Sequence, residues 1–146
     1  METGMLHLHS ILRWIILLFL LICLFQALTK NPGVRKMSLW LMISAHLMLI
    51  VGIYQVFFGR FGISKGLPAG VELMKDKFYR FFWVEHPLMM LLAIILITIA
   101  RGKAKALNYK AVSWLLFIAL ILILAAIPWP FRDIVGEGRK WFPGMK

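Results

Sequence analysis

Acidic residues and cysteines are scarce in this chain of 146 residues. It contains six Asp and Glu against 17 Lys and Arg, which gives a formal net charge of +11. Cys23 is the only cysteine, so an intrachain disulfide and a cysteine-based metal motif are both excluded. Long polar segments are also missing, which leaves no room for a soluble domain with its own core. The bases are spread along the chain without a basic stripe or a recognition motif, so we predict no nucleic-acid partner.

Apolar residues, by contrast, make up 62% of the chain, above the roughly 45–50% of soluble domains. Four apolar runs cover about residues 10–28, 37–59, 81–101 and 111–131. Each is close to the roughly 20 helical residues that cross about 30 Å of hydrocarbon. We therefore predict an all-α integral membrane protein in which four transmembrane helices form an antiparallel bundle. Residues 1–146 would be a single domain surrounded by the lipid bilayer.

The connections between these runs predict how the chain is oriented. The short connections at residues 29–36 and 101–110 hold seven bases and no acid, whereas all six carboxylates belong to the other side or its helix ends. Base-rich short loops favour the cytoplasm, so both termini are expected outside. The turn Asn31-Pro32-Gly33 predicts a tight first connection. Pro128 and Pro130 are expected to end the fourth helix, and Val71–Phe82 to form a short interfacial helix that continues into the third span.

Four histidines are the main candidates for function. His7 and His9 precede the first apolar run, His46 lies inside the second, and His86 lies near the start of the third. An ionisable ring inside a membrane is energetically expensive and marks a candidate functional site. Imidazole is also the common axial ligand of haem iron. Counted from the basic ends of the helices, all four rings fall near the midplane or in the outer half of the membrane.

Two rings can clamp one haem iron only if they lie at similar depth. On straight helices His46 and His86 differ by roughly 7 Å, and His9 and His86 by roughly 9 Å, offsets that ordinary helix tilt can absorb. We rank His46 with His86 first, as ligands of haem iron, and His9 with either ring second. Arg13 shares a helix face with His9 and would hold a haem propionate. The structural alternatives are interhelical hydrogen bonds for the histidines and an ion pair between Arg13 and Glu85.

Several segments together resemble a known family. The chain is similar to small four-helix inner-membrane proteins of Bacteroidota that are commonly labelled cytochrome b. The resemblance extends over nearly the whole chain, and the segments that carry it are Leu6-His7-Leu8-His9-Ser10, Leu12-Arg13-Trp14, Ala45-His46-Leu47, Val84-Glu85-His86-Pro87-Leu88-Met89-Met90 and Ile127-Pro128-Trp129-Pro130-Phe131. It implies b-type haem, electron transfer and a multi-pass protein of the bacterial inner membrane, whose termini would then be periplasmic.

Three functions follow from these residues. The first is a subunit that binds haem b between helices and passes electrons to or from quinone or a partner complex. The second is a non-catalytic accessory subunit of a larger inner-membrane complex, in which the histidines are structural. The third is a copper or zinc site formed by His7, His9 and His86.

Overall fold

The computed structural model describes residues 2–136, 140 and 141, which contain helices and no strand. The long helices are α1 (Glu2–Leu28), α2 (Val34–Phe58), α4 (His86–Lys105) and α5 (Tyr109–Ala126). The short ones are the 3₁₀ turn η1 (Ile63–Lys65), α3 (Lys77–Arg80) and the π-helical segment η2 (Phe81–Glu85), which leads directly into α4. The predicted all-helical fold is confirmed.

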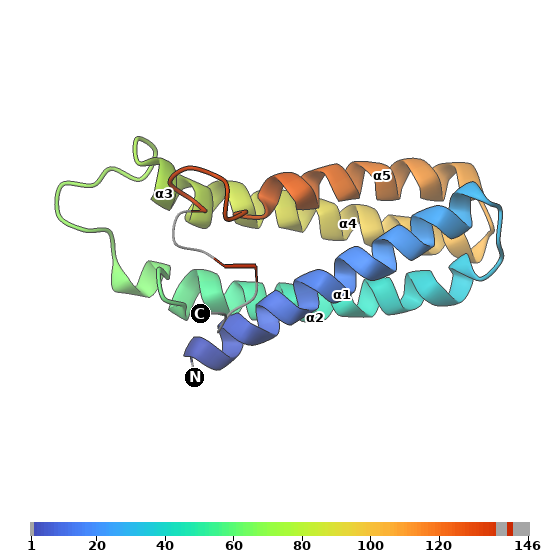
Figure 1. Ribbon diagram of the computed structural model, residues 1–146, viewed down its shortest axis with the longest axis horizontal. Coiled ribbons are helices and arrows are strands. Elements are labelled where there is room, and N and C mark those ends of the chain that lie inside the picture. The colour runs from blue at the N-terminus through green and yellow to red at the C-terminus, as the bar shows by residue number, and fades with distance from the viewer. Residues whose placement is uncertain (1, 137–139, 142–146) are drawn as a thin grey trace.

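The four long helices form an antiparallel bundle, drawn lengthwise in Figure 1. α1 packs against α2 and α5, and α4 packs against the same two helices, so α1 and α4 lie on a diagonal of the bundle. The α1–α2 and α4–α5 connections lie at one end, and the N-terminus lies at the other, with the long segment before α3 (Figure 1). We call these the short-loop end and the open end. α1 runs obliquely and diverges from α4 and α5 toward the open end.

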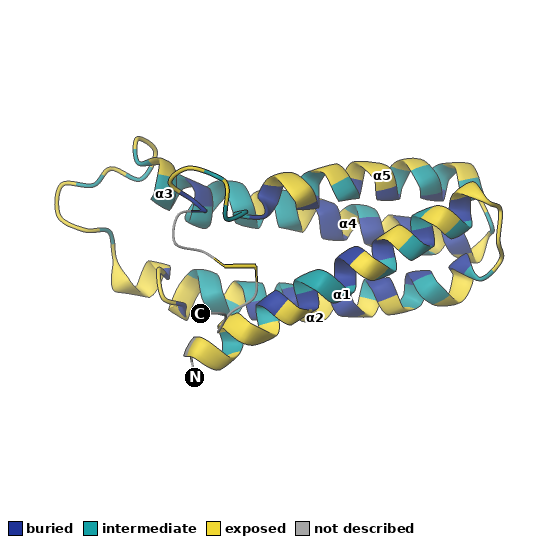
Figure 2. Ribbon diagram, in the orientation of Figure 1, coloured by how far each residue is buried: buried dark blue, intermediate teal, exposed yellow. Residues whose placement is uncertain are grey.

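The surface of the bundle is as apolar as its interior. Four helices are long and apolar enough to cross a membrane, and large apolar side chains such as Leu18, Leu21 and Ile50 are exposed on their outer faces. Figure 2 shows these exposed positions alternating with buried ones along each helix. Apolar groups on both sides of a helix are stable only where hydrocarbon surrounds the bundle. The chain is therefore a multi-pass membrane protein.

Small residues allow the helices to approach one another. Buried alanines lie on the inward faces of three helices, as expected for packing between membrane helices, where dispersion replaces the hydrophobic effect. They are Ala45 on α2, Ala93, Ala100 and Ala104 on α4, and Ala119 and Ala126 on α5. On α1 the buried stripe is Leu12, Ile16, Leu20, Cys23 and Ala27, at the spacing of one helix face.

Several element boundaries differ from the predicted ones. α1 begins at Glu2, about two turns before the expected start, so His9 lies within the helix. α5 ends at Ala126 instead of residue 131 because Pro128 and Pro130 supply no backbone donor. The tight first connection is as predicted, with the Gly33 amide donating to Asn31 Oδ1 at 2.8 Å. The interfacial helix begins only at Lys77, where Asp76 accepts a capping bond from the Tyr79 amide at 2.9 Å.

Candidate functional site

Two of the predicted histidines meet at the open end of the bundle. The rings of His9 on α1 and His86 on α4 have their centroids 6.1 Å apart, with an angle of 42° between the ring planes. Their helices lie on a diagonal of the bundle, so the rings approach each other across its interior. The depth offset expected for straight helices therefore does not keep the two rings apart.

His46 lies elsewhere. Its residue is exposed on the outer face of α2, and its Nδ1 donates to the carbonyl of Met42 one turn earlier, at 2.8 Å. The ring lines a shallow apolar groove between α2 and α4 together with Leu49 and Thr98. The structure therefore does not bring together His46 and His86, the pair that the sequence ranks first. It brings together His9 and His86, the pair ranked second. His7 is exposed.

The buried residues of each helix show whether its histidine points into the bundle or toward lipid. Ala45 belongs to the inward stripe of α2, and one residue along a helix turns the side chain by about 100°, so His46 points out of the bundle. On α4 the stripe of Ala93, Ile97 and Ala100 continues backwards to His86. On α1 the step from Leu12 back to His9 continues the inward stripe in the same way. This alanine pattern is the sequence signal that distinguishes the two faces.

His86 also completes the end of α5. A helical carbonyl accepts from the amide four residues later, and for Leu124 and Ala126 those residues are Pro128 and Pro130, which have no amide hydrogen. The His86 ring donates from Nδ1 to the Ala126 carbonyl at 2.7 Å, and the Trp129 indole donates to the Leu124 carbonyl at 2.9 Å. The proline-rich end of α5 is thus satisfied by side chains, and His86 links α4 to α5.

This bond also determines which nitrogen of His86 carries the proton. A carbonyl can only accept, so Nδ1 holds the hydrogen and Nε2 of the neutral ring holds the lone pair. A backbone carbonyl bonded to one ring nitrogen is the usual support of a histidine that ligates a metal through the other nitrogen.

A π-helical segment and an aromatic ring precede His86 along the chain. Phe81 is fully buried, and its ring centroid lies 6.0 Å from that of His86. The Arg132 guanidinium covers the Phe81 ring, with Cζ 4.9 Å from the centroid, and donates to the carbonyls of Ala125 and Ile127. π-Helical turns are frequent at functional sites because they rotate the residues that follow. The sequence analysis identified neither η2 nor the roles of Phe81 and Arg132.

Arg13 lies one turn beyond His9 on α1. Its Nη2 donates to the Trp141 carbonyl at 2.8 Å and to Ser10 Oγ at 3.3 Å, and its Cζ lies 5.2 Å from the centroid of the Trp14 ring. Its Nε is buried and has no hydrogen-bond partner among the described residues. A half-buried guanidinium with an unused donor suits an additional anionic oxygen.

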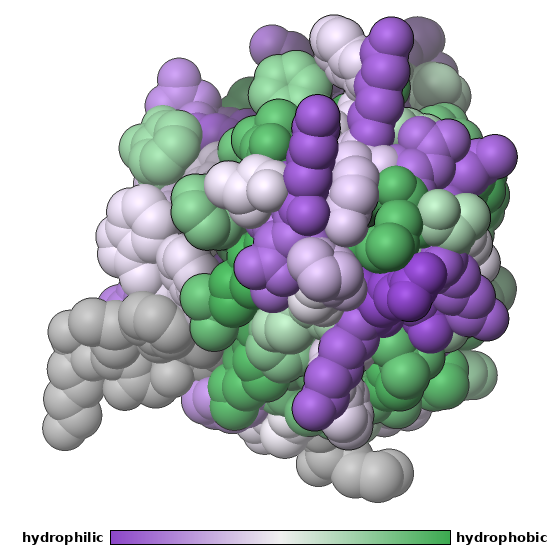
Figure 3. Space-filling view, turned by 90° about the vertical axis from the view of Figure 1, so that its right-hand side faces the viewer, coloured by the Kyte–Doolittle hydropathy of each residue, from purple (hydrophilic) through white to green (hydrophobic). Residues whose placement is uncertain are grey.

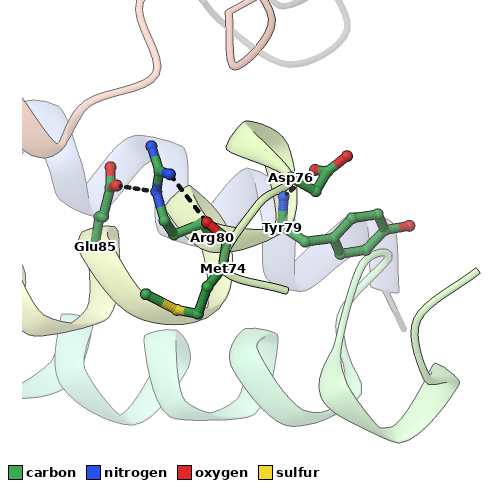
Figure 4. A network of polar contacts seen from close by, with 5 residues as sticks. All are labelled: Met74, Asp76, Tyr79, Arg80 and Glu85. Carbon is green, nitrogen blue, oxygen red and sulfur yellow. Dashed lines mark hydrogen bonds and ion pairs between the residues drawn. The ribbon is translucent and has the colours of Figure 1, made fainter. Parts of the chain in front are cut away.

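Glu85 pairs with a different arginine from the one expected. Its Oε1 accepts from Arg80 Nε at 2.7 Å, and Arg80 also donates to the Met74 carbonyl at 3.1 Å. Figure 4 shows the Arg80 guanidinium between Glu85 and Met74, at the junction of α3 and η2. The expected pair of Arg13 with Glu85 is therefore wrong, because an arginine five residues earlier satisfies Glu85 locally.

A three-ligand copper or zinc site is not formed. Among the described residues no group of three or more His, Cys, Asp or Glu side chains is placed to hold a metal ion. His7, which would have been the third ligand beside His9 and His86, is exposed at the start of α1. The remaining arrangement is a pair of imidazoles with an arginine one turn away.

Comparison with known proteins adds no further constraint. No family model, curated protein or solved structure matches the chain. The resemblance to the proteins labelled cytochrome b therefore stays a prediction.

Proposed function

We propose that this protein binds a b-type haem at the open end of the bundle, with His9 and His86 as the axial ligands, and carries electrons within the membrane. One observation carries the proposal. Two imidazoles on diagonally placed helices lie 6.1 Å apart at the ring centroids. Two metal–nitrogen bonds of about 2 Å each, together with the half-width of each ring, give a similar separation. Facing helices of a bundle are also where such sites are built.

The surrounding side chains support the same assignment. Because Nδ1 of His86 donates to the Ala126 carbonyl, the ring would bind the haem iron through Nε2. Arg13, with its buried Nε and its planar fork, would pair with a haem propionate. The haem, when bound, supplies one-electron chemistry at a potential that the axial ligands and nearby charges adjust.

The proposal extends to the setting of the protein. We place it in a bacterial inner membrane with the short-loop end in the cytoplasm and both termini in the periplasm, because the acid-free basic connections follow the positive-inside rule. Its electron donor and acceptor would be a quinol in the membrane and a partner complex. It would therefore function as a subunit of a larger assembly.

One observation favours a second function, that of an accessory subunit with structural histidines. His86 satisfies a carbonyl that Pro130 leaves without a donor, and this role alone would justify an imidazole at that position. The two functions differ at His9, which the haem site requires as a ligand of the iron.

Absorption spectroscopy of the purified full-length protein tests the proposal. Cells supplied with a haem precursor should yield protein with a b-type absorption band and a haem content close to a whole number per chain. Protein that purifies in folded form without haem, and that binds none when haem is added, would contradict the haem site and leave the accessory function.

A further inference from the structure

The short-loop end of the bundle is strongly basic. Its connections and adjacent helix ends hold seven bases, and residues 20–50 and 95–120 contain no Asp or Glu. The bases are Lys30, Arg35, Lys36, Arg101, Lys103, Lys105 and Lys110. Figure 3 looks onto this end and shows hydrophilic side chains distributed across it, with apolar ones between them. α2 and α5 also begin here without an acidic residue in the first turn, so their positive dipole ends add to the charge.

Two arginines of this end converge from different helices. Arg101, one turn before the end of α4, donates from Nη1 to the Arg35 carbonyl at 2.7 Å and more weakly to Ser38 Oγ at 3.5 Å. Arg35, in the first turn of α2, donates from Nε to the Lys105 carbonyl at 3.1 Å. The bonds therefore run in both directions between α2 and α4, and both arginines lie where these two helices meet at the short-loop end.

Much of the hydrogen-bonding capacity of these arginines is unused. A guanidinium has five N–H donors, and only carbonyl and hydroxyl oxygens accept from Arg35 and Arg101 in the described chain. The Nε of Arg101 is buried and has no partner there. Two cations with no nearby carboxylate repel each other. An anion with several oxygens would accept from the remaining donors and offset the repulsion between the two charges.

The depth of the pair indicates where that anion comes from. Trp40 and Trp114 are exposed on the outer faces of α2 and α5. Trp40 lies five residues beyond Arg35, and Trp114 lies five residues beyond the first residue of α5. Five helical residues correspond to about 7 Å toward the membrane centre. Exposed tryptophans mark the interface between hydrocarbon and headgroups. Arg35 and Arg101 therefore lie at the level of the lipid phosphates.

We propose that Arg35 and Arg101 form a binding site for the phosphate of an anionic phospholipid at the short-loop end. The planar forks of two arginines suit a phosphate diester, which a lysine contacts only as a point charge. This inference is independent of the haem proposal and of which leaflet the short-loop end faces.

The test compares variants that separate fork geometry from charge. The purified full-length protein is titrated with phosphatidylglycerol in mixed micelles, and bound lipid is counted by native mass spectrometry. The double variant Arg35→Lys/Arg101→Lys keeps the charge and loses both forks. We expect it to bind phosphatidylglycerol about tenfold more weakly, as for the loss of one charge-assisted hydrogen bond. The control Lys36→Gln/Lys110→Gln removes two charges at the same end and keeps both forks, and it should change the affinity less.

The opposite order, in which the lysine control loses more affinity than the arginine variant, would overturn the site in favour of a diffuse basic surface. Equal binding of phosphatidylcholine would also overturn it. Loss of bound phosphatidylglycerol when inorganic phosphate is added at the same concentration as the lipid would also overturn the lipid site, because a soluble anion would then occupy the arginines. If the double variant does not fold, judged by its helix content, the single variant Arg35→Lys provides the same comparison, because Arg35 is exposed.

Discussion

His86 donates from Nδ1 to the carbonyl of Ala126 at a distance of 2.7 Å, and so joins the first residue of α4 to the last residue of α5. The same bond orients the imidazole toward His9 on the diagonal helix. One side chain would thus have two roles, because it satisfies a carbonyl that a proline leaves open and, in the proposed site, it binds the haem iron. The predictions below separate these roles.

The structural role of His86 predicts a cost that is independent of haem. His86→Ala leaves the Ala126 carbonyl without a donor inside a membrane, which should lower the free energy of unfolding of the haem-free protein by about 1–3 kcal/mol. His46→Ala should cost less, since the Met42 carbonyl also accepts a bond within α2. Unfolding in mixed micelles of a denaturing detergent measures both. Equal losses for the two variants would argue against the proposed cap.

The planar guanidinium of Arg13, with its paired N–H donors, should contribute to haem binding. Arg13→Lys keeps the charge but loses the paired donors, so haem affinity should fall by about tenfold. Arg13→Gln should lower the affinity further and also lower the midpoint potential, because it removes a cation beside the haem. Haem retention and redox titration provide the measurements.

The ion pair between Glu85 and Arg80 provides a control for the Arg13 variants. Because Glu85 pairs with Arg80, Glu85→Gln should not rescue Arg13→Gln. A rescue would mean that Arg13 and Glu85 interact after all. A double-mutant cycle on Arg80 and Glu85 should give a small coupling free energy of about 0–1 kcal/mol, since their side chains are 34% and 41% exposed and water screens the pair.

Two adjacent leucines test the packing of the bundle. Leu20 is fully buried, whereas Leu21 is 52% exposed on the lipid face. Leu20→Ala should lower the free energy of unfolding by about 2–4 kcal/mol because it opens a cavity. Leu21→Ala should have little effect, since lipid fills the space. A large loss for Leu21→Ala would indicate that another protein chain covers this face.

The two ends of the bundle should lie on opposite sides of the membrane. Single cysteines at Lys103 in the short-loop end and at Ser64 in the open end are introduced into a Cys23→Ala background. An impermeant thiol reagent added to intact cells should label only the cysteine at position 64, which is the periplasmic one in the proposed orientation. Labelling of the cysteine at position 103 alone would reverse the orientation, and labelling of both in sealed cells would contradict the topology.

The sequence predicts the four helices well because length and hydrophobicity determine a membrane span. Hydrophobicity alone does not predict which face of a helix points inward, since lipid-facing and buried positions are equally apolar. His46 illustrates this limit, because an imidazole among apolar neighbours looks the same from either face and only the adjacent Ala45 marks the interior. Depth along straight, upright helices predicts an offset between His9 and His86, and the sequence does not show the helix directions that bring the two rings together. Depth alone also favours a pair of Glu85 with Arg13, whereas Arg80, five residues earlier in the chain, pairs with Glu85 in the structure.

The central claim is that His9 and His86, and not His46, hold a haem, and reduced-minus-oxidised spectra of the purified full-length protein test it most directly. The native protein should show a b-type band. His9→Ala and His86→Ala should abolish this band, while His46→Ala and His7→Ala should leave it unchanged per folded chain. Absence of the band in the native protein, or its loss in His46→Ala together with its retention in His9→Ala, would contradict the proposed site.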